Sequence, residues 1–123
     1  MKGMDLHSRL KSVSHALNGL RTLVRTQPNA RIHLVASLAA VALAAMLGLS
    51  SLEWCGIIIA VAIVWVAEAL NTSIEALCNA VSTEFHPQIR IAKDVAASGV
   101  LLAALAAVML GLIIFLRHLV RLI

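Results

Sequence analysis

The stretch VAASGVLLAALAAVMLGLIIFL, residues 95–116, runs for 22 residues without a charged side chain. A second apolar run, IHLVASLAAVALAAMLGL, covers residues 32–49, and a third begins at Trp54 and stays uncharged for 14 residues until Glu68. A helix needs roughly 20 apolar residues to cross a hydrocarbon core of about 30 Å. We therefore expect an all-α membrane protein with three transmembrane helices, at about 32–49, 54–79 and 95–116.

The composition of the whole chain agrees with these three runs. Of its 123 residues, 61% are hydrophobic and 13% are charged, whereas soluble domains average about 45–50% apolar and about 25% charged residues. Three spans leave no room for a second domain, so we expect a single membrane domain over residues 1–123. The net charge of +4 comes from residues that flank the apolar runs, almost without aromatic neighbours, and we expect no nucleic-acid partner.

The N-terminal segment has the pattern of an amphipathic helix. From Leu6 to Val24, apolar residues recur every three or four positions, and basic residues fall between them. This spacing places the apolar side chains on one helix face. The charges forbid spanning, so we expect a surface helix at about residues 5–26 in the membrane interface, ended by Pro28. A soluble helix packed on another surface is the alternative.

The basic residues also predict an orientation. Six of the ten Lys and Arg precede residue 32, two lie in the polar segment 80–94, and two follow residue 116. Basic residues near spans favour the cytoplasmic side. We expect residues 50–53 to form a short polar turn outside. The N-terminus and an 80–94 loop should be cytoplasmic, and the C-terminus should be outside.

The first and third spans are rich in alanine and glycine. Small residues let membrane helices approach closely, and close approach drives association where lipid provides no hydrophobic force between helices. Three helices barely enclose a site. We therefore expect the chain to oligomerise.

A stripe of polar residues interrupts the second span. At 100° per residue, its members lie within about 60° of Glu68 on one helix face; they are Glu68, Asn71, Thr72, Glu75 and Asn79. A carboxylate at the membrane centre costs about 2.5–3.5 kcal/mol on insertion scales, so it indicates a functional site. The structural alternative is that these side chains only hold helices together.

Glu68 and Glu75 lie about two helical turns apart, and this separation suggests that the two carboxylates have different roles. Glu68 is placed as a buried base, and Glu75 as a surface ligand for a hard cation such as magnesium. The 80–94 segment adds the cations Arg90 and Lys93 for phosphate. A proton-coupled transporter that uses Glu68 is the alternative from another class, and a purely structural oligomer is a third.

These residues closely resemble a known family. The run EALNTSIEA, residues 68–76, matches the E-x-x-N-[ST]-x-x-E-A signature of the prokaryotic diacylglycerol kinase and undecaprenol kinase family, which consists of small integral-membrane lipid kinases. Further matches are NGLR at 18–21, NARIH at 29–33, EFHP at 84–87 and AKD at 92–94. The resemblance covers nearly the whole chain, in order.

This resemblance implies a homotrimer in the bacterial cytoplasmic membrane, with active sites between subunits at the cytoplasmic interface. Magnesium ATP would phosphorylate a membrane lipid alcohol, either diacylglycerol to phosphatidate or undecaprenol to undecaprenyl phosphate. Glu68 would be the base, Asn71 would orient the reacting groups, and Glu75 and Gln27 would bind Mg²⁺. The implied ATP-binding residues are His15, Gln27, Glu75, Glu84, Phe85, His86, Lys93 and Asp94. The implied lipid-binding residues are Asn29, Ala30, Arg31, Ile32, His33, Glu68 and Ala97.

Three positions depart from the family pattern. Glutamate is usual where this chain has Gln27, aspartate where it has Asn79, and tyrosine where it has Phe85. An amide at residue 27 keeps an oxygen ligand but loses its charge, so we expect weaker magnesium binding. The RIH element at 31–33 and the segment 85–94 look more like the undecaprenol kinase branch, while both acceptors stay open.

Overall fold

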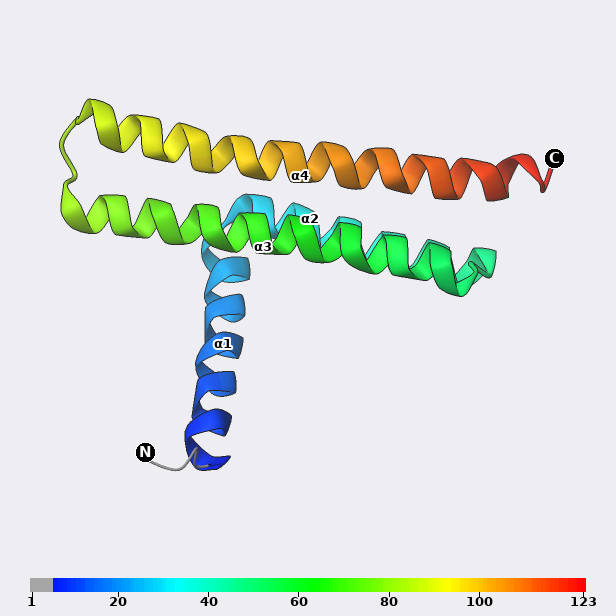
Figure 1. The fold of residues 1–123 in the computed structure, drawn as a ribbon, viewed down its shortest axis with the longest axis horizontal. Helices are drawn as coiled ribbons and strands as arrows, with labels where there is room; N and C mark the ends of the chain where they lie inside the picture. The colour runs from blue at the N-terminus through cyan, green and yellow to red at the C-terminus, as the bar shows by residue number, and fades with distance from the viewer. Residues whose placement is uncertain (1–5) are drawn as a thin grey trace.

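The computed structural model describes residues 6–123, and four α-helices contain most of them. Their bounds are Leu6–Thr26 for α1, Pro28–Leu47 for α2, Ser51–Val81 for α3 and Pro87–Val120 for α4. The three later helices lie roughly along one axis, and α1 stands across that axis at the start of α2 (Figure 1). Each predicted helical segment therefore corresponds to one helix of the structure.

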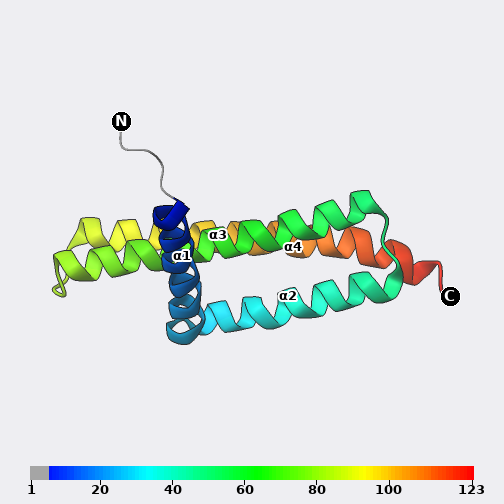
Figure 2. The same ribbon diagram turned by 90° about the horizontal axis from the view of Figure 1, so that it is seen from below.

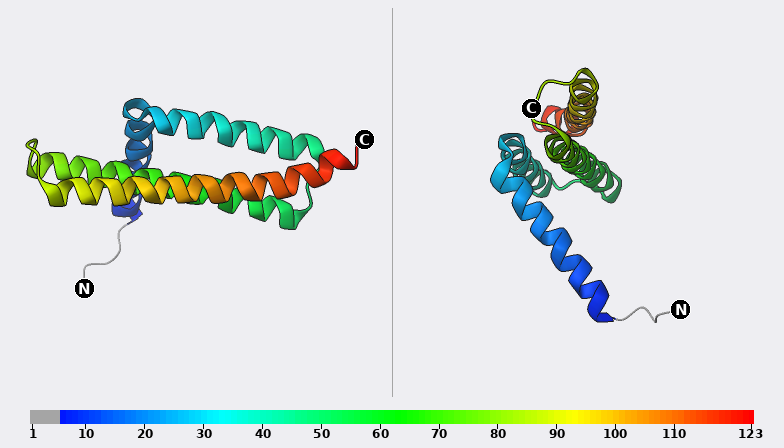
Figure 3. Two further views of the ribbon diagram at one scale, coloured as in Figure 1. Left: turned by 90° about the horizontal axis from the view of Figure 1, so that it is seen from above. Right: turned by 90° about the vertical axis from the view of Figure 1, so that its left-hand side faces the viewer.

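α2, α3 and α4 are long and apolar enough to cross a membrane. With 20 residues α2 is about 30 Å long, which matches the hydrocarbon core, whereas α3 with 31 and α4 with 34 reach about 46 and 51 Å. The surplus length of α3 and α4 projects past the corner between α1 and α2 (Figures 1 and 2). Seen end-on, the three long helices cluster together while α1 extends away from them (Figure 3).

The corner between α1 and α2 is formed at Gln27, the N-cap of α2, whose backbone is extended with φ −105° and ψ 116°. Pro28 follows at the first helical position, where its missing N–H is not needed. The guanidinium of Arg31 donates to the carbonyl oxygens of Val24, at 3.0 Å, and Arg25. It thereby satisfies carbonyls that the end of α1 leaves unpaired. Pro28 ends the first pattern as predicted, but α2 begins at residue 28 rather than 32.

The predicted polar turn at 50–53 is wrong in its bounds. The chain turns at Gly48, which has a φ of 64°, and α3 begins at Ser51. Ser50 and Glu53 form a capping box, in which the Glu53 carboxylate accepts from the Ser50 amide at 2.9 Å and the Ser50 hydroxyl accepts from the Glu53 amide at 3.3 Å. Because these bonds satisfy amides at a helix start, Glu53 belongs to the first turn of α3.

The predicted 80–94 loop is also wrong in extent. α3 continues to Val81, and only residues 82–86 separate it from α4. His86 is the N-cap of α4, since its Nδ1 accepts from the Gln88 amide at 3.2 Å, and Pro87 occupies the first helical position. Polar residues after Pro87 are therefore helical and lie on the part of α4 that projects past α1.

The cluster of buried apolar residues that pack together lies toward the end of the bundle that is far from α1. A cluster of Ala44, Leu49, Ile57 and Ile114 joins all three long helices. α3 packs chiefly against α4, and Gly56 permits this approach, since a Cβ there would lie 3.2 Å from the Ile114 side chain. Most large apolar side chains of the three helices are exposed, as suits helices that lipid surrounds.

Candidate active site

The polar stripe of α3 passes from the interior to the projecting end of the helix. Glu68 and Asn71 are buried, with only 1% and 6% of their surface exposed. Thr72 and Glu75 are half-buried, and Asn79 is exposed. The exposure of the stripe therefore rises toward the end of α3 that extends past α1.

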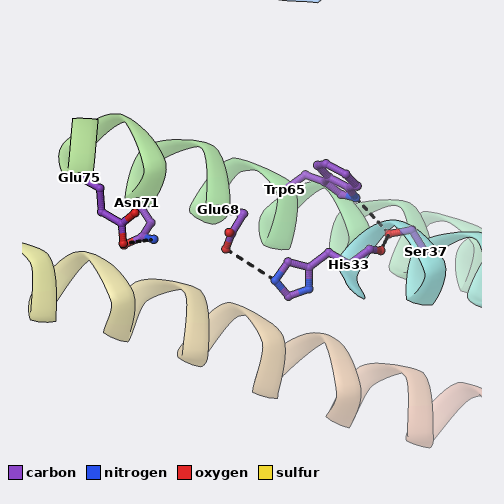
Figure 4. Close-up of polar contacts among 6 residues, drawn as sticks. All are labelled: His33, Ser37, Trp65, Glu68, Asn71 and Glu75. Carbon is purple, nitrogen blue, oxygen red and sulfur yellow. Dashed lines mark hydrogen bonds and ion pairs between the residues drawn. The ribbon is translucent and has the colours of Figure 1, made fainter. Parts of the chain in front are cut away.

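Glu68 faces a histidine from another helix. Its Oε2 lies 3.7 Å from Nε2 of His33 on α2 (Figure 4), which is too long for a hydrogen bond. Both atoms are buried, and neither has a hydrogen-bond partner within residues 6–123. A buried polar atom left unpaired costs about 1–3 kcal/mol. A ligand with a donor and an acceptor could supply the missing bonds.

Two hydrogen bonds through Ser37 link the backbone of His33 on α2 to α3. The Ser37 hydroxyl donates to the His33 carbonyl at 2.6 Å and accepts from the Trp65 indole N–H at 3.0 Å (Figure 4). Trp65 and Glu68 are three residues apart, and Ser37 is four residues after His33, so each pair lies on one helix face. Sequence reasoning missed Ser37 and Trp65, although this spacing was the available signal.

Asn71 connects the buried half of the stripe to its outer half. Its Nδ2 donates to Oε1 of Glu75 at 3.4 Å (Figure 4). Its Oδ1 and the Thr72 hydroxyl are buried without a partner among the described side chains. The sequence placed Thr72 in the polar stripe but gave it no role. The stripe thus offers several unpaired polar atoms beside the Glu75 carboxylate.

The polar side chains here suit a magnesium ion that takes most of its ligands from water and phosphate. No group of three or more His, Cys, Asp or Glu side chains in residues 6–123 could hold a metal ion. Mg²⁺ commonly takes one or two carboxylates and completes its shell with water and substrate phosphates. Glu75, with one oxygen held by Asn71, fits that role. Gln27 lies half-buried at the corner between α1 and α2.

α4 brings a cation to the outer end of the stripe. Lys93 Nζ donates to Oδ1 of Asn79 at 2.7 Å. Asp94 pairs instead with Arg90 at 3.7 Å, with both side chains more than two-thirds exposed, so this ion pair stabilises the fold by at most about 1 kcal/mol. The sequence predicted Asn79 as the last member of the polar stripe, without a role of its own, and its bond to Lys93 gives it a position beside Glu75's end of the helix.

The remaining predicted residues are spread over three regions. Glu84, Phe85 and His86 are exposed between α3 and α4. Asn29 and Ile32 are exposed in the first turns of α2, Ala30 is buried, and Arg31 is bonded to the end of α1. His15 is exposed on α1, and Ala97 is exposed on α4. The described contacts therefore join Glu68 with His33, Asn71 with Glu75, and Asn79 with Lys93.

Comparison with known proteins gives this arrangement a context. The model of the family described as prokaryotic diacylglycerol kinase matches residues 14–115. The undecaprenol kinase of Bacillus subtilis (strain 168) is 33% identical over 115 residues, which is 94% of each chain. The diacylglycerol kinase of Escherichia coli (strain K12) is 30% identical over 109 residues, 89% of each chain.

A further relative, the diacylglycerol kinase of Synechocystis sp., is 36% identical over 103 residues, which is 83% of this chain and 59% of that protein. These relatives are named as kinases of two different lipid alcohols. The comparisons give no support to the alternative of a proton-coupled transporter.

Proposed function

Since the chain belongs to the prokaryotic diacylglycerol kinase family, whose members are lipid kinases, we propose that it transfers the γ-phosphate of ATP to a membrane lipid alcohol. The acceptor is diacylglycerol, giving phosphatidate, or undecaprenol, giving undecaprenyl phosphate. Both acceptors appear in the names of its relatives. The match to the undecaprenol kinase covers 94% of this chain, and the match to the Synechocystis diacylglycerol kinase covers 83% of it.

The observation that carries this proposal is the burial of Glu68 with an unpaired carboxylate oxygen. It is a carboxylate 1% exposed inside a membrane-spanning helix, with an oxygen that has no hydrogen-bond partner among the described residues. Such a group is expensive in a membrane and marks function. As general base it accepts the proton of the acceptor hydroxyl while the hydroxyl oxygen attacks the γ-phosphorus.

The outer half of the stripe serves the phosphate end of the reaction. Asn71 holds the Glu75 carboxylate, and Lys93 lies beside Asn79, where its ammonium meets the negative charge of the phosphates. Glu75 and Gln27 would hold Mg²⁺, which would supply positive charge to neutralise the phosphates. Glu84, Phe85, His86, Asp94 and His15 complete the nucleotide site.

The site is completed by the assembly and by the membrane surface. We propose a homotrimer, in which neighbouring subunits cover faces that one chain leaves exposed, with α1 lying in the interface on its apolar face. The projecting ends of α3 and α4 then reach the cytoplasm of a bacterial cell, where ATP is available. This orientation agrees with the concentration of basic residues on that side.

The test is phosphoryl transfer by the purified protein in lipid bilayers, with γ-labelled ATP and with diacylglycerol or undecaprenol as acceptor. Glu68→Gln should lower turnover by about 10²–10⁴-fold, because an amide does not accept the hydroxyl proton. ATP binding should be retained. Glu53→Gln is a matched control at the far end of α3, where the amide oxygen still accepts from Ser50. Near-normal turnover of Glu68→Gln would remove Glu68 from this role, and no transfer to either lipid by the unaltered protein would refute the proposed function.

A further inference from the structure

The middle of α2 faces a cavity instead of packing closely against the other helices. Of residues 28–47, only Ala30 and Ala44 are buried. Between them α2 lines a cavity of about 300 Å³ that α3 and α4 complete, and its α2 wall includes His33 and Ser37. Packing between side chains therefore constrains the rotation of α2 about its own axis only weakly in this region.

A hydrogen bond joins this part of α2 to α3. The Trp65 indole N–H donates to the Ser37 hydroxyl at 3.0 Å (Figure 4). This hydroxyl donates its own proton to the His33 carbonyl at 2.6 Å, so its oxygen is oriented and left to accept. Among residues 6–123, no other hydrogen bond joins side chains of α2 and α3. Because neither lipid nor an apolar side chain can replace the partner of an indole N–H, this bond sets the rotation that packing leaves free.

The rotation of α2 decides how the surroundings of Glu68 are arranged. Ser37 lies one turn after His33 on α2, and Trp65 lies three residues before Glu68 on α3, so each pair shares a helix face. Nε2 of His33 is 3.7 Å from Oε2 of Glu68. A rotation of α2 by about 20° would move an atom that is about 6 Å from the helix axis by about 2 Å. A displacement of about 1 Å at reacting groups can lower a rate about 100-fold.

We propose that Ser37 and Trp65 are positioning residues of the kinase. Their hydrogen bond sets the rotation of α2 and thereby keeps the buried surroundings of Glu68 in the geometry for phosphoryl transfer. Both residues act through the helices that carry them and not by contact with the reacting groups. This inference rests on the proposed function, and it adds two residues that lie outside the motifs at 29–33 and 68–76.

The kinetic test is a double-mutant cycle in the full-length protein in bilayers, with γ-labelled ATP and the lipid alcohol that it accepts. Ser37→Ala and Trp65→Phe each remove one partner, and each should lower kcat about tenfold with KM for ATP unchanged. The double variant should be no slower than the slower single variant, because both changes remove the same bond. Ser37→Thr, which keeps the hydroxyl, should recover most of kcat.

Two matched controls make the same chemical changes elsewhere. Ser73 also donates to the carbonyl four residues earlier, that of Ala69 at 2.8 Å, but it is exposed. Trp54 lies on α3 at the other end of the bundle, beside the buried apolar cluster. Ser73→Ala and Trp54→Phe should therefore keep kcat within about twofold.

A second measurement needs neither ATP nor lipid acceptor. The chain has two tryptophans, so in a Trp54→Phe background the fluorescence comes from Trp65 alone. Ser37→Ala should shift its emission to shorter wavelength, because the indole N–H loses its hydrogen-bond partner. An unshifted emission would show that the bond is absent in the folded protein and would overturn the positioning role.

The outcomes separate this inference from the proposed function. If the emission shifts while both single variants keep their kcat, the bond does not position the site, and the inference is wrong although the kinase stands. Losses that multiply in the double variant, a loss that appears in KM for ATP, or no recovery in Ser37→Thr would equally overturn it. If the unaltered protein phosphorylates neither lipid, the proposed function fails, and the positioning role fails with it.

Discussion

Lys93 owes its position to the place where α4 begins. His86 and Pro87 start the helix, so that Lys93 lies in its second turn and reaches Asn79 on α3 at 2.7 Å. A loop there would hold the ammonium less firmly, because a long side chain on a mobile backbone loses more entropy when it binds. In the proposed kinase, a fixed cation meets the charge that develops on the phosphates.

Gln27 tests the magnesium site at the level of one functional group. A neutral amide compensates a divalent cation less than a carboxylate does. Gln27→Glu should therefore lower the magnesium concentration needed for half-maximal activity at fixed ATP. Glu75→Gln should raise it steeply or abolish activity. The measurement is the amount of phosphorylated lipid formed at increasing magnesium concentration by the unaltered protein and by each variant. An unchanged or higher magnesium requirement in Gln27→Glu would show that residue 27 does not face the metal.

At the scale of elements, one side chain bonds the two helices to each other at the corner between α1 and α2. Arg31 donates to two carbonyl oxygens at the end of α1, while the resemblance assigned it to the lipid. Arg31→Met should therefore speed amide hydrogen exchange in the last turns of α1 several-fold, since those carbonyls lose their partners. Hydrogen exchange measured by mass spectrometry, with Arg21→Met as the exposed control, checks this. Unchanged exchange together with a raised lipid KM would favour the lipid role.

The elements also show what the sequence could predict. The runs at 32–49 and 95–116 predicted spans because uncharged stretches of that length have few other uses. The bounds were less predictable, because Ser50 and Pro87 act through local capping that adds polar residues to a helix. The stripe from Glu68 to Asn79 followed from helical periodicity alone. The contact between Ser37 and Trp65 did not, since it depends on how α2 rotates against α3.

At the scale of the whole molecule, three spans determine which side each end occupies. α1 and the link at 82–86 lie toward one end of the long helices, and the C-terminus lies at the other (Figures 1 and 2). Eight of the ten basic residues belong to the α1 side, which is therefore expected to be cytoplasmic. A reporter fused after Ile123 should report from outside the cytoplasm, and one fused at the N-terminus from inside. Two reporters on the same side would refute the three-span topology.

The depth of Glu68 has a consequence for how the product leaves. His33, which faces Glu68, follows Pro28 by five residues, so the carboxylate lies about 7.5 Å along α2 from its first residue. In the proposed reaction an uncharged alcohol enters at this depth and a phosphate monoester with about two negative charges leaves it. Charge is costly in the hydrocarbon region, so the bilayer itself drives the new headgroup toward water. We therefore predict weak product inhibition, with added phosphorylated lipid slowing turnover far less than an equal amount of an uncharged acceptor analogue that lacks the hydroxyl. Inhibition of equal strength would contradict this membrane-driven release.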